Sequence, residues 1–164
     1  MINNYTLLCA FGILTAATIT DFRTHRIPNK LMLISAVISV IVVVITAGGA
    51  GLTNAGLGFL TGFGFYFPLA WFGVIGGGDL KLLAVVGITT GALNILMIGL
   101  FSLIWGAIFG VLQSAFRGEI KAVSQNLLHL FLFKKIENKQ LHRFPFAASM
   151  LMAALTQWSW SKMP

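Results

Sequence analysis

Two aspartates in a very apolar chain are the residues whose types and spacing could do chemistry. Asp21 opens the segment DFRTHRIPN at 21–29, and Asp79 follows three glycines in GGGDLK at 76–81. Two carboxylates held close together divide their titrations, so that the ionised one takes a proton from water while the protonated one donates to a carbonyl oxygen or a leaving nitrogen. The apparent pKa values then belong to the pair. Such a pair can divide the work of hydrolysing an amide bond.

The composition of the chain indicates what kind of protein holds these carboxylates. Hydrophobic residues make up 57% of the 164 residues and charged residues 9%, whereas soluble domains carry roughly 25% charged residues. No Asp, Glu, Lys or Arg occurs at 31–78 or at 82–116, and a membrane-spanning helix needs about 20 apolar residues. The sequence therefore predicts an all-α, polytopic membrane protein with a single transmembrane domain over 1–164.

The apolar segments divide into six expected transmembrane helices. The turn-forming segment TAGGAGLTN at 46–54 separates two of them, which places the first three helices at about 4–20, 30–47 and 54–73. The segment 80–116 is broken by TTGALN at 89–94, so we expect it to cross the membrane twice, with a short first crossing. A last apolar segment at about 144–160 makes six.

The basic residues predict the orientation, because loops rich in Lys and Arg face the cytoplasm. One group lies in the first polar loop and the other in the last: Arg23, Arg26 and Lys30, and then Arg117, Lys121, Lys134, Lys135, Lys139 and Arg143. The N-terminus is then outside, and only Lys162 lies on the outer side. Basic residues follow the first helix instead of preceding it, so we expect no cleaved signal peptide. Both aspartates are expected at the cytoplasmic face of the membrane.

The remaining polar residues suggest no further chemistry. The net charge of +7 is explained by topology and by attraction to anionic membrane lipid, and predicts no nucleic-acid partner. The loop 117–143 is expected to be cytoplasmic and basic, either an interfacial helix or a plain connecting helix. Cys9 is the only cysteine, and the histidines lack the spacing of metal ligands (His25, His129 and His142). No metal or organic cofactor is predicted.

Each aspartate also has a simpler interpretation. Asp79 before an apolar segment is typical of a helix N-cap, and Asp21 could be a solvated residue of a basic loop. Together they are harder to explain in this way, because a carboxylate costs about 2.5 to 3.5 kcal/mol at the centre of a membrane helix and these are the only two aspartates. The glycines before Asp79 permit a positive φ and a close approach of a peptide backbone.

The two motifs resemble the signatures of the prepilin peptidase family, the GxGD class of membrane aspartyl proteases. Gly76, Gly78 and Asp79 match G-x-G-D, with a lysine at the expected offset, and DFRTHRIPN matches the motif at the end of the first helix. RFPFAASMLMAAL at 143–155 is similar to the start of the last helix in that family. The resemblance implies removal of a short basic leader from type IV pilin-like precursors at the cytoplasmic face of the bacterial inner membrane.

The resemblance also implies roles for single residues. It makes Asp21 and Asp79 the catalytic pair, and it gives Gly76 and Gly78 the role of letting Asp79 reach its partner. The other matched positions are Arg23, Arg26, Pro28, Asn29 and Lys81. Pro28 and Asn29 are expected to turn the chain into the second helix. Lys81 lies two residues from Asp79 and points away from it in a helix, so a lipid phosphate or a substrate carbonyl is as good a partner as the carboxylates.

The chain differs from the larger members of that family. Those members carry a cytoplasmic segment with paired cysteines and N-methylate the trimmed pilin, whereas here about nine residues separate the first two expected helices and one cysteine is present. The chain is therefore similar to a peptidase-only form, like the peptidases of tight-adherence (Flp) pilus systems; an archaeal preflagellin peptidase is a further alternative. Two other classes stay open, a small ion-coupled transporter and a non-catalytic envelope scaffold.

Overall fold

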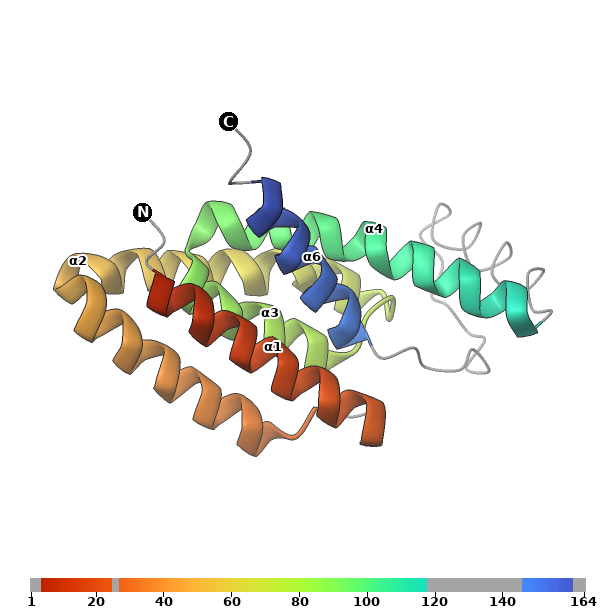
Figure 1. Cartoon of the computed structure of the whole chain (residues 1–164), viewed down its shortest axis with the longest axis horizontal. Helices are drawn as coiled ribbons and strands as arrows, with labels where there is room; N and C mark the ends of the chain where they lie inside the picture. The colour runs from red at the N-terminus through yellow and green to blue at the C-terminus, as the bar shows by residue number, and fades with distance from the viewer. Residues whose placement is uncertain (1–3, 25–26, 118–145, 161–164) are drawn as a thin grey trace.

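The residues that the structure describes form a bundle of helices. The computed structural model describes residues 4–24, 27–117 and 146–160, and these contain no strand. The helices are α1 (Asn4–Thr24), α2 (Asn29–Trp71), α3 (Gly77–Thr90), α4 (Ala92–Arg117) and α6 (Phe146–Trp160) (Figure 1). The expected all-α fold is confirmed. The loop at 118–143 lies outside the described residues.

Helix α2 bends sharply at Gly48 and so consists of two arms. Gly48 has φ 60° and ψ −153°, which interrupts the helical backbone, and glycine adopts a positive φ at little steric cost. Both arms, 29–47 and 49–71, run from this bend toward the same end of the bundle (Figure 1). The turn expected at 46–54 is therefore present as a bend within one long helix.

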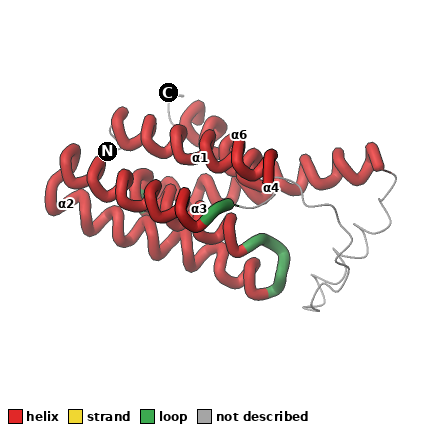
Figure 2. Tube along the Cα trace, turned by 90° about the horizontal axis from the view of Figure 1, so that it is seen from below, coloured by secondary structure: helices red, strands yellow, loops and turns green. Residues whose placement is uncertain are grey.

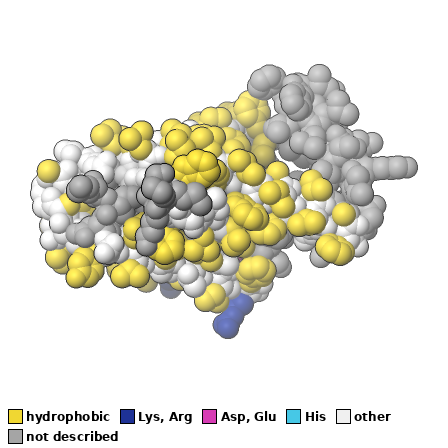
Figure 3. Space-filling model, turned by 45° about the horizontal axis from the view of Figure 1, so that its top comes forward, with side chains coloured by type: hydrophobic (Ala, Val, Ile, Leu, Met, Phe, Trp, Pro, Cys, Tyr) yellow, Lys and Arg dark blue, Asp and Glu magenta, His cyan; other side chains and the backbone are white. Residues whose placement is uncertain are grey.

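The six expected membrane crossings are not confirmed. Three helices are long and apolar enough to cross a membrane: Asn4–Thr24, Asn29–Trp71 and Ala92–Gln113. Helix α3 has 14 residues and α6 has 15, fewer than the about 20 that a crossing needs, and α2 joins two of the expected helices. The chain is an integral membrane protein, and hydrophobic side chains are spread over its surface (Figure 3).

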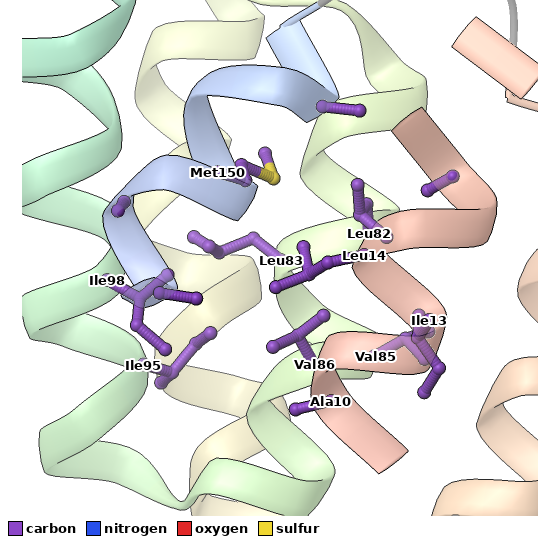
Figure 4. Close-up of a cluster of buried hydrophobic side chains, with 14 of the residues drawn as sticks. Ala10, Ile13, Leu14, Leu82, Leu83, Val85, Val86, Ile95, Ile98 and Met150 are labelled. Carbon is purple, nitrogen blue, oxygen red and sulfur yellow. The ribbon is translucent and has the colours of Figure 1, made fainter. Parts of the chain in front are cut away.

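Helix α3 lies at the centre of the bundle. Every residue from Leu82 to Thr90 is buried, because α1, α2, α4 and α6 all pack against this helix. Figure 4 shows Leu83 and Val86 of α3 meeting Leu14 of α1 and Met150 of α6. A helix enclosed in this way has a fixed position, and its N-terminal turn, which carries Asp79, lies at its more exposed end.

Helix α3 packs very closely against the second arm of α2. A Cβ atom added to Gly58 would lie 2.0 Å from the carbonyl oxygen of Gly87, and one added to Gly87 would lie 2.2 Å from that of Gly58. One turn further, a Cβ atom on Gly62 would lie 2.7 Å from the carbonyl oxygen of Leu83. Gly58 and Gly62 form a G-x-x-x-G pair, the pattern that lets membrane helices approach backbone to backbone.

Candidate active site

The two aspartates lie at the same end of the bundle. Asp21 is in the last turn of α1 and Asp79 is in the first turn of α3, and these two helices pack against each other. The longer of the loops drawn in green in Figure 2, residues 72–76, leads into α3 at Asp79. The negative charge of Asp21 is near enough to raise the pKa of Asp79. The structure therefore brings the two carboxylates into electrostatic contact.

Asp79 is at the third position of α3 and is not its N-cap. The N-cap is Gly76, with φ −74° and ψ 148°, and its carbonyl oxygen accepts from the N–H groups of Asp79 (3.1 Å) and Leu80 (3.2 Å). The Asp79 carboxylate reaches back to a backbone hydrogen bond with Gly76, which is half of a capping box. Asp79 therefore does help to cap the start of α3, but it does so from the third position of the helix and not from the N-cap position.

Asp21 is a buried helical residue and not part of a solvated loop. Helix α1 continues to Thr24, and only 8% of the Asp21 surface is exposed. Its Oδ2 atom accepts a hydrogen bond of 3.3 Å from the backbone N–H of Ala147. Ala147 is the second residue of α6, where backbone N–H groups lack partners inside the helix. The N-terminus of α6 thus supplies a donor to this carboxylate, and such a bond is strongest when the acceptor is ionised.

The environment of Asp79 favours its protonated form. Asp79 lies outside the three helices that are long enough to cross a membrane. Removal from water is the main cause that raises the pKa of Asp79 to about 7, the charge of Asp21 adds to it, and the hydrogen bond with Gly76 opposes it. Near neutral pH, Asp79 is therefore divided between its acid and its carboxylate form. Two carboxylates in such different surroundings can act as base and acid.

The two sequence motifs touch each other at two further points. The Nζ atom of Lys81 donates a hydrogen bond of 3.0 Å to Oδ1 of Asn29. A Cβ atom on Gly78 would lie 3.4 Å from Cβ of Ile27, in ordinary contact. Lys81 points away from Asp79 as its spacing predicts, and its partner in the structure is the side chain of Asn29.

The first motif connects α1 to α2 by a short turn. Pro28 is the N-cap of α2, with φ −64° and ψ 136°, and Asn29 is its first residue, so the expected turn into the second helix is confirmed. Arg23 is exposed in the last turn of α1, and Arg26 lies outside the described residues.

The glycines before Asp79 differ from the expectation. Positive φ values among the described glycines occur at Gly48, Gly73 and Gly91, so Gly76 and Gly78 are not needed for backbone conformation. The constraint at Gly76 is space, because an added Cβ atom would lie 3.1 Å from Oδ2 of Asp79. Gly77 has no atom within 4 Å of such a Cβ.

Sequence reasoning missed the residues that support this end of α6. The phenol of Tyr66 forms a buried hydrogen bond with Ser102, and the Tyr66 ring packs against Phe146 at 6.1 Å between centroids and 60° between planes. Phe146 directly precedes Ala147, the donor to Asp21. The FPFA sequence at 144–147 is the signal for this feature, but its contacts depend on tertiary packing.

Two hollows lie on the bundle. A groove of about 380 Å³ runs beside Lys81 and Asn29, with Met32, Phe59 and Val85 in its lining. A larger cavity of about 470 Å³ lies at the opposite end, and its lining mixes apolar residues such as Val43 and Ile88 with amide and hydroxyl side chains. Within the described residues, no three His, Cys, Asp or Glu side chains come together, so these residues offer no metal-ligand set.

Comparison with known proteins decides the family. The model of the type IV leader peptidase family matches residues 8–111. The chain belongs to this family. Its membership confirms the resemblance to prepilin peptidases, and implies a protease that acts on a pilin-type precursor. No curated protein and no solved structure matches the chain. The matched residues include Asp21 and Asp79 but end before α6 begins. The contact between α6 and Asp21 therefore lies outside the part of the chain that the family model covers.

Proposed function

We propose that this chain is an aspartic endopeptidase that removes the short basic leader of type IV pilin-like precursors, with Asp21 and Asp79 as its catalytic pair. The observation that carries the proposal is the electrostatic coupling of these two carboxylates at one end of the bundle. They come from two different helices, α1 and α3, which the whole of α2 separates in the sequence, and they are the only aspartates of the chain. A chance meeting of the two would be a poor explanation, because carboxylates near a membrane are costly.

The surroundings of the two carboxylates assign a role to each. Asp21 accepts the N–H of Ala147 and acts as the base, whereas Asp79, with a pKa of about 7, acts as the acid. Water attacks the scissile carbonyl carbon while Asp21 takes a proton from the water and Asp79 gives its proton to the carbonyl oxygen. Asp21 then passes its proton to the leaving nitrogen, and Asp79 recovers a proton from a hydroxyl of the diol as the C–N bond breaks.

The groove beside Lys81 and Asn29 suits a hydrophobic segment of the substrate. Its lining by Met32, Phe59 and Val85 is apolar, and Lys81 at its rim carries N–H donors that can hold a peptide carbonyl. The loop 72–76 before α3 is largely exposed and Asp79 is half-buried, so an extended peptide can approach Asp79 along this loop. A leader cut just before a hydrophobic segment would fit this arrangement.

The finer assignments rest on the chain itself. We propose a peptidase without methyltransferase activity, similar to the peptidases of Flp pilus systems, because only residues 25–28 separate α1 from α2 and Cys9 is the only cysteine. The basic residues around 23–30 and 117–143 support an active site on the cytoplasmic side of the inner membrane. Family membership favours this function over the transporter and the scaffold.

Cleavage of a co-expressed Flp-type prepilin tests the proposal, read by its size shift and its new N-terminus. We expect the wild type to cleave and Asp21→Asn and Asp79→Asn to be inactive at matched membrane levels. Gly12→Ala is the control in α1, because a Cβ atom there meets nothing within 4 Å; it should cleave like the wild type. Retained cleavage in either Asn variant would refute the two-carboxylate mechanism.

A further inference from the structure

The first residue of α6, Phe146, directly precedes Ala147, whose backbone N–H donates to Asp21. We propose that Phe146, seated between Gly106 of α4 and Tyr66 of α2, is a positioning residue that keeps the Ala147 N–H on the Asp21 carboxylate. This inference rests on the proposed function, because it assigns a role in the same reaction. It concerns a segment that lies outside the residues matched by the family model.

The seat of Phe146 is tight on the side of α4. A Cβ atom added to Gly106 would lie 2.5 Å from Cε2 of Phe146 and 3.3 Å from its Cδ2 and Cζ. Real Cβ atoms do not approach other atoms to 2.5 Å, so any larger residue at 106 must displace the ring. Glycine at this position therefore sets how deeply Phe146 can sit.

On its other side, Phe146 packs against Tyr66, which is held firmly in place. Tyr66 is fully buried, its ring lies edge-on to Phe146, and its hydroxyl bonds to Ser102. The Ser102 hydroxyl in turn donates to the carbonyl oxygen of Gly99 over 2.7 Å. Because this chain of hydrogen bonds ties Tyr66 to the backbone of α4, a displaced Phe146 has to carry the start of α6 with it.

The other end of α6 is fixed independently. Gln157 donates to Asn94 over 2.8 Å, and Trp105 donates to Thr156 over 3.0 Å. A change at Phe146 therefore tilts the N-terminus of α6 without releasing the helix from α4. Ala147 follows Phe146 directly, so its 3.3 Å bond to Asp21 is the contact that such a tilt lengthens first.

A size-exchange experiment tests this role in the purified full chain with a prepilin substrate. Gly106→Ala should lower kcat about ten- to a hundredfold, as misplacement of catalytic groups by about 1 Å does, with KM within about twofold, since the groove beside Lys81 is untouched. Adding Phe146→Leu to Gly106→Ala should restore kcat to within about threefold of wild type, because the smaller side chain makes room for the new methyl group.

Gly110→Ala is the matched control, since a Cβ atom there meets nothing within 4 Å; it should keep the wild-type kcat. If Gly106→Ala fails to fold, Phe146→Ala is assayed in its place. Its kcat should be at least tenfold lower than that of the wild type. A Gly106→Ala or Phe146→Ala variant with wild-type kcat, or a double variant without rescue, would overturn the inference. If Asp21→Asn also cleaves, it is the proposed function that fails; if Asp21→Asn is inactive, only the role of Phe146 fails.

Discussion

Lys81 Nζ lies 3.0 Å from Oδ1 of Asn29, and this hydrogen bond joins two motifs that are 52 residues apart in the sequence. Asn29 is the first residue of α2, and Lys81 is two residues after Asp79. The bond therefore fastens the start of α2 to the first turn of α3. Because Lys81 is only two residues from Asp79, we expect loss of this bond to disturb the position of that carboxylate.

Loss of this bond should weaken cleavage without abolishing it. A hydrogen bond that involves a charged group contributes about 1.5 to 3 kcal/mol at most, and less at an exposed site, so we expect Lys81→Met and Asn29→Ala each to lower kcat/KM about three- to tenfold. The kcat/KM of the double variant should be no lower than that of the less active single variant, because the two substitutions remove the same hydrogen bond. Cleavage assays of the four proteins give this comparison; fully additive losses would show that the two residues act separately.

Substitution at Gly76 should disturb Asp79 more than substitution at Gly77. A methyl group at 76 would lie 3.1 Å from Oδ2 of Asp79, whereas one at 77 meets nothing within 4 Å. We expect Gly76→Ala to lower kcat at least threefold and Gly77→Ala to stay within about twofold of wild type, since small displacements of a catalytic group are costly. Equal rates for the two variants would count against a steric role for Gly76.

The raised pKa of Asp79 should make the folded protein less stable as the pH rises. In the folded chain burial and Asp21 raise this pKa from 3.8 to about 7, so between these values the folded state binds more protons than the unfolded state. Stability from this group is then present below about pH 4 and is lost as the pH rises through 7. Unfolding in detergent from pH 4 to 9 should show a fall in wild type relative to Asp79→Asn; parallel curves would contradict it.

The close crossing of α2 and α3 should be intolerant of even one methyl group. Gly58→Ala places a Cβ atom 2.0 Å from the carbonyl oxygen of Gly87, so the two backbones must separate, at a cost of about 1 to 3 kcal/mol. Gly64→Ala in the same arm meets nothing within 4 Å and should be neutral or slightly stabilising. Thermal unfolding of both variants in detergent measures the difference, and equal midpoints would exclude a packing role for Gly58.

Much of the site could be predicted because the types of its residues are themselves unusual for this chain. Charged residues are so rare that Asp21 and Asp79 stand out, and the glycines around 48 predict the bend of α2. The donor to Asp21 could not be predicted, since every residue except proline carries a backbone N–H and nothing in the type of Ala147 distinguishes it. The sequence also predicts membrane crossings at α3 and α6, which are shorter than the about 20 residues that a crossing needs, because apolar composition is the same for a helix enclosed by protein and one that faces lipid.

The burial of α3 on all sides has a consequence for how this sequence can change over generations. Each side chain from Leu82 to Thr90 is enclosed by neighbouring helices. A larger or smaller residue at any of these positions therefore disturbs the packing of its neighbours. On the first arm of α2, by contrast, residues such as Ile34, Val37 and Ile41 are exposed and can exchange with other apolar residues at little cost. Divergent descendants of this protein should therefore keep the segment that follows Asp79 as their most recognisable stretch, while the outer faces of the bundle drift freely among leucine, isoleucine and valine.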